Sequence, residues 1–124
     1  KLLLKAYKRG GILCGVSAGA ICWFEKGVTD SWASNLNVMD CMGFIDGCCC
    51  PHYDGEKDRR PSVSKFITDS VIDSCYALDD GAALHYKNGK LHTAVTFLEG
   101  AGAYDVSLKN GEVHHENMKS INIG

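Results

Sequence analysis

The chain has 124 residues, with 13 Lys and Arg against 15 Asp and Glu, so its formal net charge is −2. Hydrophobic residues make up 45% and charged residues 23%, a composition typical of a globular domain and not of a disordered or fibrous chain. The charge balance gives no basic surface for nucleic acid or anionic membranes, and no apolar run reaches the roughly 20 residues that span a bilayer. We therefore expect one α/β domain over residues 1–124, without nucleic-acid or membrane partners.

The first half of the chain predicts helices that alternate with short buried strands. In chain order, the pattern predicts a helix over 1–9, a strand over 12–16, a helix over 17–24 and a loop over 25–37. A second short strand, centred on Cys48–Cys50, is predicted within 44–51. Gly10-Gly11 ends the first helix, and both strands are apolar runs typical of burial on two faces. Trp23, Phe24 and Trp32 surround the second helix, where we expect them in the core or a pocket wall.

The second half begins with a helical stripe and ends in hairpins. Apolar residues at helical spacing follow Pro61: Val63, Phe66, Ile67, Val71, Ile72 and Cys75. Residues 76–78 predict a third strand. Asn-Gly turns at 88–89 and 110–111 lie between alternating runs and predict two antiparallel hairpins at a sheet edge.

The chain has seven cysteines, an odd number, and those at 48–50 are consecutive. Neighbours on a strand point to opposite faces and pair badly with one partner, so we expect no disulfide framework. This favours a reducing compartment, and we expect a cytoplasmic location. Cys48, Cys50 and His52 share a strand parity and are the candidate metal ligands. No second Cys-x2-Cys group accompanies them, and we therefore expect no metal site. The hydrolase chemistry inferred below needs no cofactor, and we expect none.

Strands that alternate with helices favour a parallel sheet, whose ligands bind beyond the carboxyl ends of the strands. The polar residues that follow the three predicted strands are Ser17, His52 and the pair Asp79-Asp80. A serine, a histidine and a carboxylate at one sheet edge are the nucleophile, base and base-orienting group of a hydrolase.

Ser17 lies in Gly15-Val16-Ser17-Ala18-Gly19, a Gly-x-Ser-x-Gly sequence at a predicted strand-to-helix turn. The glycines suit a strained, closely packed turn, and the N–H of Ala18 would point at a developing oxyanion. The motif alone also fits a small-residue turn that lets a helix pack tightly on a sheet, and a lone His52 also fits a structural histidine. Their occurrence at successive strand ends favours the hydrolase.

Gly15–Ala20, Pro51-His52-Tyr53 and Leu78–Gly81 together resemble the serine peptidases of family S51, the group of dipeptidase E and cyanophycinase. The resemblance covers essentially the whole chain. It implies an α/β parallel-sheet three-layer sandwich, related to class I glutamine amidotransferase-like and flavodoxin-like folds, with antiparallel hairpins at the C-terminal end. It also implies a Ser-His-Glu triad, in which Ser17 matches the nucleophile, His52 the base, and Asp80 stands at the position of the Glu.

Two departures from the family pattern leave alternatives open. Asp80 is one methylene shorter than Glu, so Asp79 and Asp30 are the alternative acids. The family's Gly-Gly-Asn segment and first strands have no counterpart here. We therefore expect a fragment of a longer chain, with a complementing N-terminal segment or a homo-oligomer as partner.

The resemblance also suggests a substrate. Aspartyl dipeptidases bind an acidic side chain, for which Arg is the natural partner, and by similarity Arg60 is the candidate. We predict a serine-type peptidase that hydrolyses small peptides of the Asp-X kind. The alternatives are an amidase or esterase with the same triad and an inactive binding or structural member of the fold.

Overall fold

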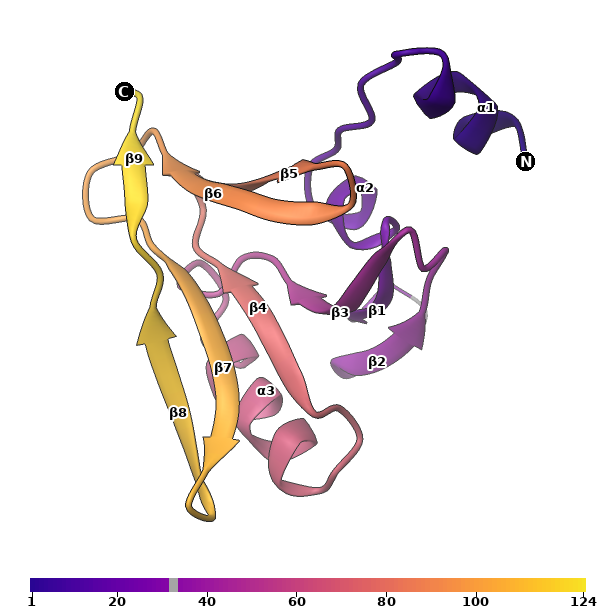
Figure 1. The fold of residues 1–124 in the computed structure, drawn as a ribbon. Helices are drawn as coiled ribbons and strands as arrows, with labels where there is room; N and C mark the ends of the chain where they lie inside the picture. Colours follow the sequence, from indigo (N-terminus) through magenta and orange to yellow (C-terminus); the bar gives the residue numbers. More distant parts are fainter. Residues whose placement is uncertain (32–33) are drawn as a thin grey trace.

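The computed structural model describes residues 1–31 and 34–124 and shows a mixed α/β fold (Figure 1). The described helices are α1 (Leu2–Lys8), α2 (Ala18–Ile21) and α3 (Arg59–Thr68). The described strands are β1 (Phe24–Thr29), β2 (Asn37–Asp40), β3 (Ile45–Cys50), β4 (Ser74–Leu78), β5 (Ala82–Lys87), β6 (Lys90–Thr96), β7 (Ala103–Lys109), β8 (Glu112–Asn117) and β9 (Ser120–Asn122). Trp32, expected in the core or pocket wall, lies outside the described residues. Across this described part, none of the helices has the length and apolar character needed to cross a bilayer.

The larger sheet has the strand order β2-β1-β3-β4-β7-β8. Only its centre is the predicted parallel sheet, because β1, β3 and β4 run parallel while β2, β7 and β8 are antiparallel to their neighbours. The alternation of side chains along β3 divides the core between two faces. Cys48 and Cys50 pack with α3 residues such as Val63, whereas Cys49 packs with Ile21 of α2 on the other face.

Residues 12–16 form no strand, which corrects the first strand prediction. An apolar run becomes a buried strand only beside another strand that completes its hydrogen bonds, and no described strand pairs with this segment. Ile12 and Val16 are therefore 91% and 85% exposed. Ser17 consequently follows a segment without regular secondary structure instead of a strand.

The helix predicted over 17–24 and the loop over 25–37 are also corrected. α2 ends at Ile21, and β1 begins at Phe24. Gly27 reads as a loop signal in the sequence, but it serves packing, because a Cβ at this position would meet the side chain of Ile21. The glycine thus allows α2 to lie directly against β1.

α3 ends at Thr68 and does not continue to Cys75 as predicted. The Ser70 N–H donates to the Ile67 carbonyl at 3.1 Å and the Val71 N–H to the Phe66 carbonyl at 2.9 Å. With Ser70 at a φ of 58°, these bonds form a Schellman motif that ends the helix. Glycine is usual at this position, so the serine does not mark the helix end in the sequence.

Both hairpins are confirmed, and one of their positions is corrected. Asn88, Gly89, Asn110 and Gly111 all have positive φ, as two-residue hairpin turns require. The β7–β8 hairpin forms an edge of the larger sheet, but β5 and β6 form a separate sheet with β9. Residues of this smaller sheet pack with Cys49 and Leu78, so the hairpin covers a face of the larger sheet instead of extending it (Figure 1).

Candidate active site

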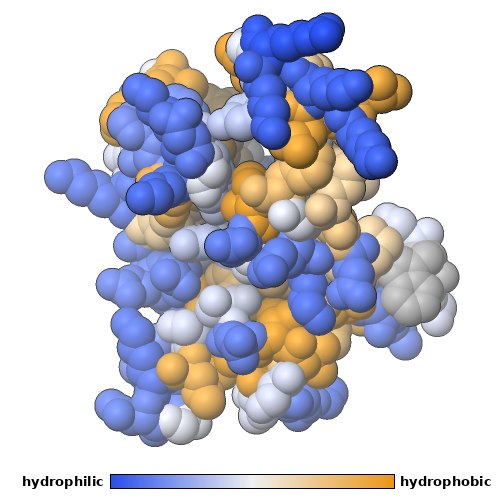
Figure 2. All heavy atoms as spheres, turned by 45° about the vertical axis from the view of Figure 1, so that its right-hand side comes forward, coloured by the Kyte–Doolittle hydropathy of each residue, from blue (hydrophilic) through white to orange (hydrophobic). Residues whose placement is uncertain are grey.

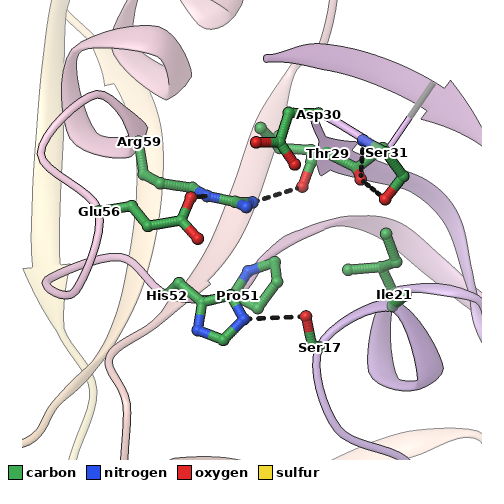
Figure 3. Close-up of a pocket in the computed structure, with 11 residues that line it drawn as sticks. Ser17, Ile21, Thr29, Asp30, Ser31, Pro51, His52, Glu56 and Arg59 are labelled. Carbon is green, nitrogen blue, oxygen red and sulfur yellow. Dashed lines mark hydrogen bonds and ion pairs between the residues drawn. The ribbon is translucent and has the colours of Figure 1, made fainter. Parts of the chain in front are cut away.

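Ser17 stands at a sharp turn directly before α2. Its φ of 54° and ψ of −118° lie where an L-residue is strained. Gly15 permits this turn, because a Cβ there would overlap the carbonyl of Gly19. The Ala20 N–H donates to the Ser17 carbonyl at 2.9 Å, which fixes the main chain at the start of the helix. The Ser17 hydroxyl is left pointing toward His52 (Figure 3).

His52 follows the carboxyl end of β3 and, like Ser17, has a positive φ, of 56°. Its Nε2 lies 2.8 Å from the Ser17 Oγ, and its Nδ1 lies 2.6 Å from the Asp80 Oδ1. The histidine side chain is 29% exposed. One imidazole ring thus joins a hydroxyl and a carboxylate that are 63 positions apart in the chain.

A tight turn after β4 presents Asp80. The Ala82 N–H donates to the Asp79 carbonyl at 3.0 Å, and Gly81 has a φ of 91°. This is the pattern of a type II turn, with Gly81 supplying the positive φ at the third position. Asp80 occupies the second position, at the apex, from which its side chain reaches His52.

The two alternative acids lie elsewhere. Asp79 is 5% exposed, and its Oδ2 accepts hydrogen bonds from the Gly102 N–H at 2.9 Å and the Tyr104 hydroxyl at 3.4 Å. Burial raises the pKa of the Asp79 carboxyl. Asp30 lines a cavity beside Ser17. Within the described ranges, neither carboxylate forms a hydrogen bond with His52.

A cavity of about 110 Å³ opens beside Ser17, between α2, the end of β1 and the loop after His52 (Figure 3). Most of its side chains are polar, and they include Thr29, Asp30, Ser31, Glu56 and Arg59. Sequence reasoning missed Thr29 and Ser31, because it assigned the end of β1 to a loop. A cavity of this size and polarity suits a small polar group of a substrate.

The adjacent arginines of α3 have different surroundings. Arg59 lines the cavity and is 4% exposed; its Nε donates to the Glu56 Oε2 at 2.7 Å and its Nη1 to the Val28 carbonyl at 2.8 Å. Arg60, the candidate for substrate binding, instead places its guanidinium 4.4 Å from the ring centre of Tyr53 and is not among the residues that line the cavity.

The two cysteines considered as metal ligands, Cys48 and Cys50, are core residues. All seven cysteines are free, and Cys48 and Cys50 are at most 3% exposed. Burial raises the pKa of the Cys50 thiol to about 12, so the thiol is neutral near pH 7 and packs as a small apolar group. Among the residues that the structure describes, no cluster of three or more His, Cys, Asp or Glu side chains is arranged to hold a metal ion.

A sequence model of peptidase family S51 matches residues 1–94, a span that contains Ser17, His52 and Asp80. The chain belongs to peptidase family S51. A protein of Bacillus subtilis (strain 168), described as the uncharacterized peptidase YgaJ, is 50% identical over 112 residues, which are 90% of this chain and 48% of that protein. The chain thus spans about half the length of this curated relative. The resemblance drawn from the motifs is confirmed at the level of the family.

In this member of family S51, Arg59 should contribute strongly to stability. Arg59→Ala would leave the Val28 carbonyl and the Glu56 carboxylate without their donors. We expect the free energy of unfolding to fall by about 2–3 kcal/mol in urea denaturation. Arg60→Ala removes only an exposed contact with aromatic rings and should cost about 1 kcal/mol or less. Equal losses in the two variants would contradict the bridging role of Arg59.

His115 of β8 contacts two side chains near the site. The hydroxyl of the buried Tyr53, the residue after His52, lies 2.5 Å from the His115 Nδ1, and the His115 Nε2 lies 3.3 Å from the Ser64 Oγ. Partial burial, followed by the nearby charge of Arg60, lowers the pKa of His115 below its usual 6.5. These three side chains come from separate parts of the chain, so no local sequence pattern indicates the contact.

The lowered pKa of His115 predicts a pH-dependent stability. The unfolded chain takes up a proton on this histidine at a higher pH than the folded chain does. The stabilising contribution is therefore present above about pH 6.5 and is lost as the pH falls through the lowered pKa. Urea denaturation at a series of pH values should show this loss, and His115→Gln should reduce its slope. A variant with the wild-type slope would contradict the assignment.

Proposed function

We propose that the chain carries the catalytic side chains of a serine-type peptidase that hydrolyses small peptides. The observation that supports this is the line of hydrogen-bonded side chains from Asp80 through His52 to Ser17, with distances of 2.6 and 2.8 Å. Ser17 is the nucleophile, His52 the general base and Asp80 the acid that orients the base. The strained main chain at Ser17 and His52 supports this assignment, because such strain concentrates at functional sites.

The proposed reaction is acyl transfer. With Nδ1–H donated to Asp80, the His52 Nε2 accepts the proton of Ser17 as the hydroxyl attacks the peptide carbonyl carbon. Asp80 stabilises the imidazolium that forms, and His52 then protonates the leaving amine. In the second half, His52 takes a proton from water as the water attacks the acyl-enzyme. His52 then returns this proton to the Ser17 oxygen as the ester bond breaks and the carboxylic acid product leaves.

Ala18 is the proposed donor to the oxyanion. Its N–H follows the nucleophile at the start of α2 and, within the described part of the chain, donates no hydrogen bond. A donor aimed at the tetrahedral intermediate stabilises charge that develops only during the reaction. We also propose a relation to the three-layer sandwich of class I glutamine amidotransferases, supported by α3 and α2 lying on opposite faces of the larger sheet.

A substrate panel tests the peptidase proposal. Asp-X dipeptides, other dipeptides, amides and p-nitrophenyl esters would be supplied to the wild type and to Ser17→Ala. We expect hydrolysis of dipeptides by the wild type, with preference for Asp-X as the resemblance implies, and none by the variant. Turnover restricted to esters, or equal turnover by both proteins, would reject the proposal.

The proposed partner is a complementing N-terminal segment or a second copy of the chain. Exposed apolar side chains in the N-terminal region support it, with Leu2, Ile12 and Val16 at least 82% exposed. Figure 2 shows hydrophobic surface between hydrophilic side chains on one face of the molecule. Light scattering would detect a second copy, and turnover that rises when the unmatched part of a relative is added would identify a complementing segment.

A further inference from the structure

The three residues after His52 contact the end of β4 and the turn that carries Asp80. The Tyr53 N–H donates to the Leu78 carbonyl at 2.9 Å. The Asp80 N–H donates to the Asp54 Oδ1 at 2.8 Å. The loop that carries the base is therefore joined directly to the main chain of the acid, through bonds that do not involve the His52 side chain.

Gly55, the third of these residues, leaves room for the Asp80 carboxylate. A Cβ at position 55 would overlap the Asp80 Oδ2, and the three nearest atoms that it would meet beyond its chain neighbours all belong to the Asp80 side chain. The φ of Gly55 lies outside the left-handed region, so its main chain does not require glycine. The space around the Asp80 side chain is thus the physical reason for the glycine at this position.

The Asp54 side chain is not needed to form its own loop. The Glu56 N–H donates to the His52 carbonyl at 3.2 Å, and the Arg59 N–H donates to the Glu56 carbonyl at 3.0 Å, so main-chain bonds close this segment. Asp54 is exposed, and among the described residues its side chain forms one hydrogen bond, which it accepts from the Asp80 N–H. The contact with the acid is therefore what the carboxylate contributes.

Asp80 depends on such support. Its side chain is 53% exposed at the apex of a turn, and with only two rotatable bonds it cannot compensate for a displacement of its main chain. Displacing a catalytic group by about 1 Å can cost roughly 100-fold in rate. We propose that Asp54 is a positioning residue, which fixes the main chain at Asp80 so that its carboxylate meets the His52 Nδ1. This rests on the proposed function only in taking Asp80 as the acid of the triad.

Four variants test the proposal: Asp54→Ala, Asp54→Asn, Gly55→Ala and the exposed Asp73→Ala as control. Two readouts are needed, kcat and KM on a dipeptide and the low-field proton resonance of the His52 Nδ1–H. We expect Asp54→Ala to lower kcat by about 10- to 100-fold with little change in KM, and to shift or broaden the resonance. Asp54→Asn keeps an oxygen acceptor and should stay within about 3-fold of wild type.

Gly55→Ala gives an independent result, because its Cβ would displace the Asp80 carboxylate while Asp54 is kept. It should lower kcat and perturb the resonance as Asp54→Ala does, whereas Asp73→Ala should change neither. The proposal is overturned if Asp54→Ala keeps the wild-type kcat and resonance, or if Asp54→Asn loses as much as Asp54→Ala. It is also overturned if the wild type shows no such resonance.

The resonance requires no turnover, so the two proposals fail separately. A wild type that hydrolyses no substrate would reject the peptidase proposal, while the resonances of the variants would still decide the role of Asp54. If Asp54→Ala does not fold, as judged by circular dichroism, Asp54→Asn and Gly55→Ala carry the test.

Discussion

Ser17→Ala is expected to lower kcat by about 10⁴-fold or more, with little change in KM. In the proposed reaction, the substitution removes the oxygen that forms the acyl-enzyme, and the His52 Nε2, 2.8 Å away, would have no nucleophile to activate. The residual rate would reflect substrate binding and the proposed oxyanion donor, the Ala18 N–H. Steady-state kinetics on a dipeptide measure the loss, with the exposed Ser74→Ala as control. A Ser17→Ala variant that keeps more than about a tenth of wild-type kcat would show that another group is the nucleophile.

Asp80→Asn should lower kcat by roughly 10³- to 10⁴-fold. The amide of asparagine can donate to the Nδ1, which favours the tautomer whose Nε2 carries the proton and cannot accept one from Ser17. The charge that stabilises the imidazolium is also lost.

Asp79→Asn is the matched control for Asp80→Asn, because the two carboxylates are adjacent and only that of Asp80 contacts His52. An asparagine at position 79 keeps an oxygen for the Gly102 N–H and no longer buries a charge. We expect kcat within about 10-fold of wild type, from steady-state assays on the same dipeptide. A larger loss in Asp79→Asn than in Asp80→Asn would make Asp79 the acid.

The parts of the fold that the sequence predicted well depend on local signals. Asn-Gly is one of the few residue pairs that adopt positive φ at both positions without strain. Both hairpins, with turns at 88–89 and 110–111, were therefore predictable. The strand β3 was predictable from Cys48–Cys50, which are buried on both faces of the sheet, whereas the similar run at 12–16 lacks a neighbouring strand and is exposed. The residues that follow β3 and β4 could be named as site candidates by the rule that parallel strands end at one sheet edge.

The parts that were missed depend on contacts between distant residues. Gly27 looks like a loop residue until Ile21 is placed against it, and Ser70 does not look like a helix end until its φ is known. Arg59 and Arg60 are neighbours on a helix that point in directions about 100° apart, as 3.6 residues per turn require. No local pattern says which of them faces the cavity.

Peptide mapping after reaction with a serine-reactive phosphonate tests the central claim most directly, because it reports whether the Ser17 hydroxyl is activated whatever the natural substrate is. We expect one adduct per chain, on Ser17, and a large fall in its rate of formation in His52→Ala. A folded protein that forms no adduct at Ser17, or forms one there at the same rate without the histidine, would contradict the triad of Ser17, His52 and Asp80.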